Sequence, residues 1–524
     1  MNPIELFFGL LLVAVAIALV AKRLDQPYPI ALVLGGLALS LLPGVPRFQL
    51  DPNVVFLLFL PPILGEAAYF TSWRDFWRYR RSILLLAFGL VTATSAGVAA
   101  VCVYLIPGMN WATGFALGAI VSPPDAAAAT SITRGLRLPR RIVQILEGES
   151  LVNDASGLVI YRFAVAAVVT GVFSWTNAGL TLLWVALGGA GLGVALALLY
   201  VRLYPLLKDP EVEIISTFFL TYSAYFIAEA MHASGVLATV AAGLILGWHA
   251  PTLFSAQTRI RATAVWQTAI FVINALVFFL IGLQLPHIWS SVQGLPINRL
   301  ALWSALVIGA VILIRLAWIF PGAYLPRLLS RRIRETESKP PWQWVMVTGW
   351  TGLRGVVSLA AALALPLDFP QRDLILLLSF AVILATLLFQ GLTLRTLICW
   401  LRVNDDGSSE AELLKARLHA VERVVEHLSR SDQAAPAPVL ERVRGFHEDR
   451  LAVLRAQLSE EIGAEAQKNP TAFNTLAEQR LWWELARVER EAVLDLRRRH
   501  VIGDEALHQI QNELDLLEAR LVPR

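Results

Sequence analysis

Five acidic residues lie in apolar stretches of this 524-residue chain: Glu66, Asp125, Glu147, Glu149 and Asp154. An ionisable group at the centre of a membrane costs several kcal/mol, about 3 on insertion scales, so it is kept mainly for function or to neutralise another charge. A lone acid of this kind is sometimes only half of a salt bridge that holds two helices together. Five acids outnumber the buried cations available to them, which favours a binding site.

Asp125 and Asp154 are expected at similar depth, near the middle of the membrane. At 1.5 Å per residue, the helix that follows Arg140-Arg141 carries Asp154 about 20 Å into a core about 30 Å thick. Helical spacing puts Ser150 on the face of Asp154, while Glu149 turns toward another partner. Carboxylate, hydroxyl and freed carbonyl oxygens suit a hard cation. Because burial disfavours an ionised carboxylate, a proton and the cation can compete for these oxygens.

Composition indicates that most of the chain lies in lipid. It is 56% hydrophobic and 16% charged, whereas soluble domains are about 45–50% apolar and about 25% charged. Residues 1–404 carry a net charge of +10 and residues 405–524 a net charge of −6, which predicts a membrane domain followed by a separate domain. Since the basic excess lies in loops between apolar spans, no nucleic-acid partner is expected. Cys102 and Cys399 support neither a disulfide framework nor a metal site.

Thirteen apolar segments qualify as transmembrane helices, taking about 20 residues as one crossing and allowing fewer where Pro or Gly interrupts. The first, Ile4 to Ala21, lacks a basic leader and a small-residue cleavage site, so we expect it to be retained. The segments begin near Ile4, Pro29, Val54, Ile83, Trp111, Ile142, Ala178, Val212, Gly235, Ala264, Leu300, Trp342 and Leu374.

The distribution of basic residues predicts the orientation of these spans. The loops after odd-numbered spans hold 21 Lys and Arg, whereas the loops after even-numbered spans hold only Arg47, Arg299 and Arg372. Cytoplasmic loops are the basic ones. We therefore expect the N-terminus outside and the C-terminus in the cytoplasm.

Two interrupted helices indicate an inverted repeat. Pro123-Pro124 breaks helix 5 before Asp125, and the run from Gly349 to Gly355 breaks helix 12. A shift of seven spans relates helices 1–6 (about residues 4–173) to helices 8–13 (about residues 212–400) in opposite orientation. Secondary transporters use this plan and place the site at the midplane, on the broken helices.

Three arginines also lie in apolar segments. We expect Arg354, in the second break, to pair with Glu149 and to brace the helices, since an arginine in the coordination shell would repel a cation. Arg162 and Arg315 are expected to snorkel or to contact carbonyl groups.

At these residues the chain resembles the monovalent cation/proton antiporters, in the electroneutral sodium/proton exchanger branch with NhaP-type bacterial members. The resemblance covers about residues 1–400 and rests on the joint occurrence of four motifs. These are Pro61-Pro62-Ile63-Leu64-Gly65-Glu66, Ser122-Pro123-Pro124-Asp125, Glu149-Ser150-Leu151-Val152-Asn153-Asp154 and Gly352-Leu353-Arg354-Gly355.

The resemblance implies that Asp125 and Asp154 bind the transported ion, assisted by Ser150, Asn153 and the main chain at Pro124, with Glu66 at the edge. It also implies a Glu149–Arg354 pair, one-for-one exchange because Asn153 stands where the electrogenic branch has a second Asp, and a homodimer in a bacterial inner membrane. No cofactor is expected beyond the transported Na⁺, K⁺ or Li⁺ and H⁺. Na⁺ is favoured, but Pro124-Asp125-Ala126 replaces the family's Thr-Asp-Pro and leaves K⁺ open.

The tail, residues 405–524, is predicted to be a cytoplasmic helical domain that regulates transport. It opens with a polar linker, and its apolar residues recur with helical spacing. Breaks at Pro436/Pro438, Asn469-Pro470 and Gly503 divide it into about four helices, and Trp482-Trp483 is expected in their core.

Two other classes of function are weighed against a transporter. A passive cation channel needs a continuous polar lining, often built by several subunits, whereas these acids form one compact group. An intramembrane enzyme is disfavoured because the chain has no His-Glu-x-x-His, Gly-x-Ser-x-Gly or phosphate-binding lysine loop.

Overall fold

The structure is a computed structural model that describes residues 3–24, 26–42, 55–133, 136, 138–170, 181, 183–292, 294–405, 407–430 and 437–462. The chain divides into two compact units, Met1–Asp405 and Asp406–Arg524. Every element assigned within the described residues is helical, so the predicted all-α class is confirmed.

The first part of the membrane unit ends with a 31-residue helix, α9 (Arg140–Thr170). The elements before α9 are α1 (Pro3–Arg23), α2 (Tyr28–Ser40), η1 (Val55–Phe59), α4 (Leu60–Phe70), α5 (Trp73–Leu84), η2 (Leu85–Leu90), α6 (Val91–Leu105), α7 (Trp111–Val121) and α8 (Ala126–Thr133).

The second part runs from η3 (Trp184–Gly188) to α21 (Gly391–Trp400). Between them lie α11 (Gly189–Leu203), η4 (Tyr204–Leu206), α12 (Pro210–Ala230), α13 (Gly235–Leu253), α14 (Ala256–Leu283), α15 (Leu285–Ser291), α16 (Ile297–Leu329), α17 (Arg331–Thr336), α18 (Trp342–Trp350), α19 (Val356–Leu363), α20 (Arg372–Ala385) and η5 (Thr386–Gln390).

Seven helices in the described part of the chain are long and apolar enough to cross a membrane, from Trp73–Leu105 to Arg372–Trp400. Shorter apolar helices occupy Tyr28–Ser40, Leu57–Phe70 and Trp111–Val121. Helical segments occupy the regions of the thirteen predicted spans, although the third start, near Val54, and the seventh, near Ala178, lie outside the described residues. A multi-pass membrane protein is therefore established, and the number of crossings stays a prediction.

The start of α7 is fixed by reciprocal side-chain caps. Asn110 Oδ1 accepts from the backbone N–H of Thr113 at 2.9 Å, and Thr113 Oγ1 accepts from the backbone N–H of Asn110 at 2.9 Å. This capping box satisfies N–H groups that the first turn of a helix leaves unpaired. Because the caps fix the first turn of α7, the length of the helix determines how deep in the membrane its last residue, Val121, lies.

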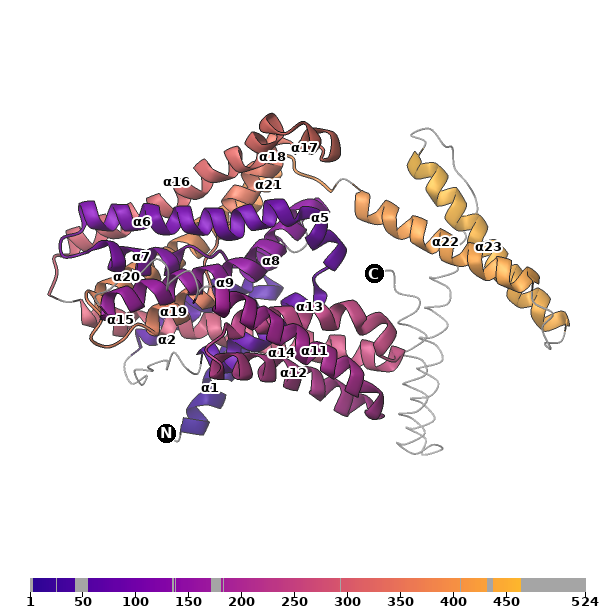
Figure 1. Ribbon diagram of the computed structural model, residues 1–524, viewed down its shortest axis with the longest axis horizontal. Helices are drawn as coiled ribbons and strands as arrows, with labels where there is room; N and C mark the ends of the chain where they lie inside the picture. The colour runs from indigo at the N-terminus through magenta and orange to yellow at the C-terminus, as the bar shows by residue number, and fades with distance from the viewer. Residues whose placement is uncertain are drawn as a thin grey trace. The chain divides into compact units, whose positions relative to one another are not determined.

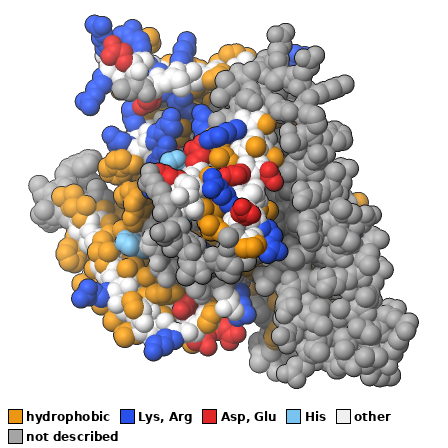
Figure 2. Space-filling model, turned by 90° about the vertical axis from the view of Figure 1, so that its right-hand side faces the viewer, with side chains coloured by type: hydrophobic (Ala, Val, Ile, Leu, Met, Phe, Trp, Pro, Cys, Tyr) orange, Lys and Arg blue, Asp and Glu red, His pale blue; other side chains and the backbone are white. Residues whose placement is uncertain are grey.

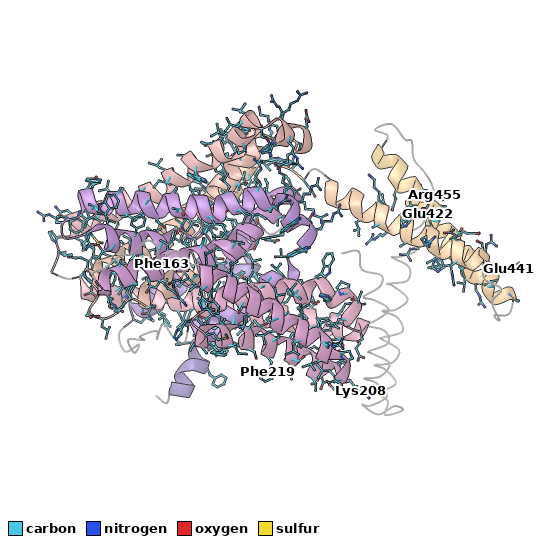
Figure 3. All side chains as sticks on the ribbon, viewed as in Figure 1. Phe163, Lys208, Phe219, Glu422, Glu441 and Arg455 are labelled. Atoms are coloured by element: carbon cyan, nitrogen blue, oxygen red, sulfur yellow. The ribbon has the colours of Figure 1, made fainter. Side chains whose placement is uncertain are left out.

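The helices form two packed groups (Figure 1). One group contains α4 and α11 to α14, in which α13 packs on both α4 and α11. The other contains α6, α7, α9, α16, α18 and α20, with α6 packed between α7 and α16. Apolar side chains also point outward, as Phe219 does from α12 with 67% of its surface exposed (Figure 3). Such a surface suits lipid.

The C-terminal unit contains a pair of packed helices, α22 (Ser408–Arg430) and α23 (Ala437–Ile462). Leu414, Val421, Leu451 and Leu454 form their core. Arg455 and Glu422 join the pair at 2.9 Å (Figure 3). The predicted breaks at Asn469-Pro470 and Gly503, and Trp482-Trp483, lie outside the described residues.

Candidate functional site

The first helix break lies between α7 and α8, as predicted from the two prolines. Pro123 and Pro124 carry no N–H, so neither can continue the helical hydrogen bonds. The chain resumes its helix at Ala126. At the break, the backbone N–H of Asp125 donates to the carbonyl of Leu353 at 2.7 Å. This bond joins the first break to the second.

The second break lies between α18 and α19 and contacts Asp125 directly. Gly355, the residue before α19, packs so closely that a Cβ atom built on it would lie 1.8 Å from Asp125 Oδ2. Only glycine permits this approach. The Asp125 carboxylate therefore lies at the start of its own helix α8 and beside the start of α19, where the helix dipoles favour negative charge.

Two buried arginines satisfy the carbonyl groups at the opposite ends of the breaks. Arg354 Nε donates to the carbonyl of Val121 at 2.8 Å, at the end of α7. Arg315 donates to the carbonyls of Gly349 and Thr348, each at 3.1 Å, at the end of α18. These carbonyls have no partner within their own helices. Each interrupted helix is thus capped by a cation at its negative end.

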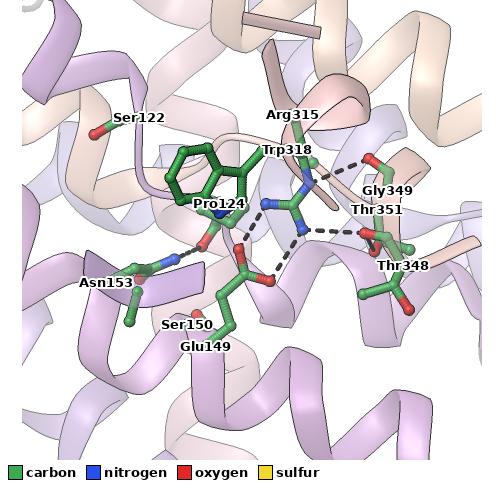
Figure 4. Close-up of polar contacts among 12 residues, drawn as sticks. Ser122, Pro124, Glu149, Ser150, Asn153, Arg315, Trp318, Thr348, Gly349 and Thr351 are labelled. Carbon is green, nitrogen blue, oxygen red and sulfur yellow. Dashed lines mark hydrogen bonds and ion pairs between the residues drawn. The ribbon is translucent and has the colours of Figure 1, made fainter. Parts of the chain in front are cut away.

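The prediction that Glu149 pairs with Arg354 is wrong, because Glu149 pairs with Arg315 (Figure 4). Arg315 Nη1 lies 2.6 Å from Glu149 Oε1, and Nη2 lies 3.0 Å from Oε2. The guanidinium of Arg354 is instead directed at the carbonyls of Val121, Ser122 and Gly352. Arg354 remains a brace between helices, but its partners are backbone groups.

A cavity of about 290 Å³ lies at the crossing of the broken helices. It is lined by Asp125, Asp154 and Ser150, with Glu66, Glu147 and Pro124 also in its wall. Ser150 Oγ accepts from the backbone N–H of Ala126 at 3.2 Å, which ties α9 to the start of α8. The structure therefore brings five of the predicted ion-binding residues, Glu66, Pro124, Asp125, Ser150 and Asp154, around one space.

Asn153 is not among the residues that line this cavity. It is fully buried, and its Nδ2 donates to the carbonyl of Pro124 at 3.0 Å (Figure 4). Its side chain therefore positions the backbone beside Asp125. Glu149 and Arg354, the predicted structural pair, also lie outside the lining.

The cavity wall contains four polar residues that the sequence did not single out. Thr71 and Thr130 are half-buried, and the other two are Asn274 of α14 and Ser358 of α19. These last two are buried, and Ser358 Oγ has no hydrogen-bond partner among the described residues. Ser358 lies just after the second break, so the inverted repeat itself was the signal that pointed to it. Asn274 is a lone polar residue in an apolar span, a pattern that usually reflects helix packing.

No group of three or more His, Cys, Asp or Glu side chains in the described ranges is arranged to hold a resident metal ion. The cavity between the broken helices is lined by the oxygen-bearing side chains of Asp125, Ser150 and Asp154. With two carboxylates and a hydroxyl, it offers ligands for a small hard cation.

Comparisons with known proteins agree with this arrangement. The family described as "Sodium/hydrogen exchanger, transmembrane" matches residues 10–400. An uncharacterized Na⁺/H⁺ exchanger of Mycobacterium tuberculosis is 33% identical over 99% of this chain and 97% of its own length. A "sodium, potassium, lithium and rubidium/H⁺ antiporter" of Bacillus subtilis is 29% identical over 97% of this chain and 77% of its own length.

The fold is similar to that of MjNhaP1, a sodium proton antiporter from Methanocaldococcus jannaschii, with a TM-score of 0.58 and 18% identity over 75% of this chain and all of that one. Family membership favours exchange over a passive channel and excludes the enzyme alternative. The chain belongs to the transmembrane sodium/hydrogen exchanger family and is a cation/proton antiporter.

Proposed function

We propose that this antiporter exchanges Na⁺ for H⁺, with K⁺ and Li⁺ as alternative cargo, at Asp125 and Asp154. The observation that carries the proposal is the single cavity lined by both aspartates and Ser150. The Bacillus subtilis relative is named for sodium, potassium, lithium and rubidium, which supports testing several ions. Glu66 and Glu147 add further carboxyl oxygens to the wall.

The two cargoes compete for the same oxygens. Removing a carboxylate from water disfavours its ionised form, and either a bound cation or a proton relieves that penalty. When the cation leaves, a proton takes its place. Raising the proton concentration is therefore expected to raise the cation concentration needed for half-maximal exchange, without changing the maximal rate.

One-for-one exchange is supported by Asn153. Its amide cannot titrate, and its Nδ2 is committed to the carbonyl of Pro124. The pair Asn153-Asp154 therefore supplies one carboxylate. Exchange in liposomes is then expected to respond to a pH gradient but not to an imposed membrane potential. A flux that changes with potential would contradict the 1:1 ratio.

Alternating access is supported by a second cavity, of about 620 Å³, further along α9. Its wall includes Leu158 and Arg162, whereas the first cavity is lined by Ser150 and Asp154 of the same helix. An apolar cluster that includes Leu60, Leu64, Leu151, Ala155, Tyr225, Val236 and Val240 contributes to both walls. This layer would close the path on one side, and movement of α9 against α12 and α13 would open it.

The orientation and assembly stay part of the proposal. The asymmetry of Lys and Arg between loops supports an outside N-terminus in a bacterial inner membrane. The family resemblance supports a homodimer in which one helix group moves against the other. Labelling of single cysteines from each side of the membrane, and the mass of the purified protein in detergent, test these two points.

The decisive experiment measures exchange by purified protein in liposomes against Na⁺, K⁺ and Li⁺ gradients. Asp125→Asn and Asp154→Asn are each expected to abolish proton-coupled cation flux while leaving the protein folded. Asp373→Asn is the matched control, because Asp373 is exposed in the first turn of α20 and away from the cavity. Full exchange by Asp154→Asn would overturn the assignment of the site.

A further inference from the structure

A cluster of arginines lies apart from the cation cavity, where α5 and α16 end and α9 begins, near the connection from α17 to α18. Glu337 is bound by two of them: Arg81 Nη2 lies 2.7 Å and Arg327 Nη2 2.8 Å from its Oε2. Arg141 Nη1 donates to the backbone carbonyl of Ser338 at 3.2 Å. Two guanidinium groups therefore bind the Glu337 carboxylate, and a third binds the next residue along the chain.

Two N–H groups of the arginine cluster have no hydrogen-bond acceptor within the cluster. Arg327 is 7% exposed, and its Nε is buried without a hydrogen-bond partner among the described residues. Arg81 Nη1 is buried and unpartnered in the same way. A buried charged donor without an acceptor destabilises the folded protein. The three arginines and Glu337 together carry two positive charges in excess, and two of the guanidinium N–H groups have no acceptor. A ligand that satisfies both would be an anion with several acceptor oxygens.

An apolar cleft of about 60 Å³ leads away from these arginines. One water-sized group needs roughly 10–15 Å³ by this measure, so the cleft has room for several such groups. Arg141 and Arg327 belong to its wall, and the remainder is largely aliphatic and aromatic. The apolar lining includes Leu85, Leu86, Ile145, Ile319 and Val345.

The cluster also lies at the depth of a membrane surface. Arg141 is at the start of the apolar helix Arg140–Val169, and Arg327 is at the end of Ile297–Leu329. On α5, Trp77 is 55% exposed and lies 5.2 Å from the guanidinium of Arg80. Exposed tryptophan beside arginine is typical of the headgroup region. Lys and Arg side chains are prominent in the upper part of the face drawn in Figure 2.

We propose that this cleft binds an anionic phospholipid, whose phosphate contacts Arg81, Arg141 and Arg327 and whose acyl chain enters the apolar cleft. Phosphate oxygens accept from guanidinium groups with good geometry. The apolar cleft next to the arginines selects a lipid over a free phosphate. The occupant would also touch Thr348, whose carbonyl accepts from Arg315 at 3.1 Å. Lipid binding is therefore expected to stabilise the end of α18.

The test measures binding of phosphatidylglycerol to the full-length protein in detergent, by native mass spectrometry and by the rise in unfolding temperature. Phosphatidylcholine, whose zwitterionic headgroup has no net charge, and glycerol 3-phosphate, which has no acyl chain, serve as the comparison probes. Phosphatidylglycerol alone is expected to bind and to stabilise. Equal effects of phosphatidylcholine, or stabilisation by glycerol 3-phosphate at the same concentration, would overturn the proposal.

Two kinds of variant test the arginine charge and the space inside the cleft separately. Arg141→Gln is expected to weaken phosphatidylglycerol binding about fivefold, as for the loss of one basic residue near an anionic lipid. Arg331→Gln is its control, since Arg331 is exposed and pairs with the exposed Glu335. Ile145→Trp fills the cleft and leaves every arginine in place, with Leu302→Trp as an exposed control on α16. Unchanged affinity in both Arg141→Gln and Ile145→Trp would contradict the site.

Discussion

Arg315 holds both carboxylate oxygens of Glu149, and each of the two side chains is 1% exposed. The same guanidinium caps the end of α18, so one residue joins α9, α16 and the second helix break. A buried pair of this kind is seldom worth more than an apolar replacement, but removing one partner leaves an uncompensated charge.

Loss of one partner of this pair is therefore expected to destabilise the protein strongly. Glu149→Leu or Arg315→Leu should each lower the free energy of unfolding by about 3–5 kcal/mol. The double variant should lose less than the sum, because no charge is stranded. Thermal unfolding in detergent measures these effects, and the exposed pair Arg331–Glu335 serves as the control. Additive losses would contradict the coupling.

Gly355→Ala is expected to reduce exchange tenfold or more, because the new methyl group would overlap the Asp125 carboxylate. The displaced carboxylate could no longer share the cavity with Asp154. Gly309→Ala is the matched control, since a Cβ there meets nothing within 4 Å. Exchange assays in liposomes compare the two. Normal activity of Gly355→Ala would show that the close contact is not needed.

Ser150→Ala removes the acceptor for the N–H of Ala126 and one oxygen of the cavity. One hydrogen bond contributes about 0.5–1.5 kcal/mol, so the cation concentration for half-maximal exchange should rise roughly 2- to 12-fold. Ser131→Ala is the control, because that hydroxyl bonds only within α8, to Ala128. Equal effects from both substitutions would remove Ser150 from the site.

The first half of the site could be predicted from sequence because its signals are local. Pro123-Pro124 breaks a helix whatever its neighbours are, and four-residue spacing puts Ser150 beside Asp154. The partner of Glu149 could not be predicted in this way. Arg315 lies in a long apolar span, and nothing in such a span indicates which side of the helix faces α9.

The role of Asn153 shows a related limit. Its position in the motif indicates proximity to the ion, but the sequence cannot tell whether the amide faces the cavity or a backbone carbonyl. In the structure it holds Pro124. Asn274 was missed for a similar reason, since a single polar residue in an apolar helix carries no sign of the space it faces. Ser358 could have been found from its place just after the second break.

The pair of Arg162 on α9 and Glu229 on α12 spans the wall of the second cavity at 2.8 Å. Both side chains are partly exposed, so the pair is worth only about 0–1 kcal/mol. If α9 moves against α12 during exchange, Arg162→Gln should raise turnover by up to about fivefold, with little change in unfolding temperature. Turnover equal to that of the unaltered protein would argue against movement at this contact.

The α22–α23 pair offers a test of the proposed regulatory tail. Leu454→Asp puts a charge into the small core formed with Val421, whereas Val443→Asp changes an exposed position on the same helix. We expect only Leu454→Asp to alter the exchange rate or its response to pH. Unchanged exchange in Leu454→Asp and after truncation at Ser409 would show that the tail does not tune transport.

The contacts between the two helix breaks also affect the order of events during synthesis and membrane insertion of the chain. Arg354 Nε reaches the carbonyl of Val121 across 233 residues of sequence, and Leu353 accepts the N–H of Asp125. Until the second repeat leaves the ribosome, the first break therefore has a carbonyl and an amide without these partners. The nascent first repeat must keep those groups hydrated or bound elsewhere, so insertion of the early helices precedes completion of the binding site by most of the time of translation.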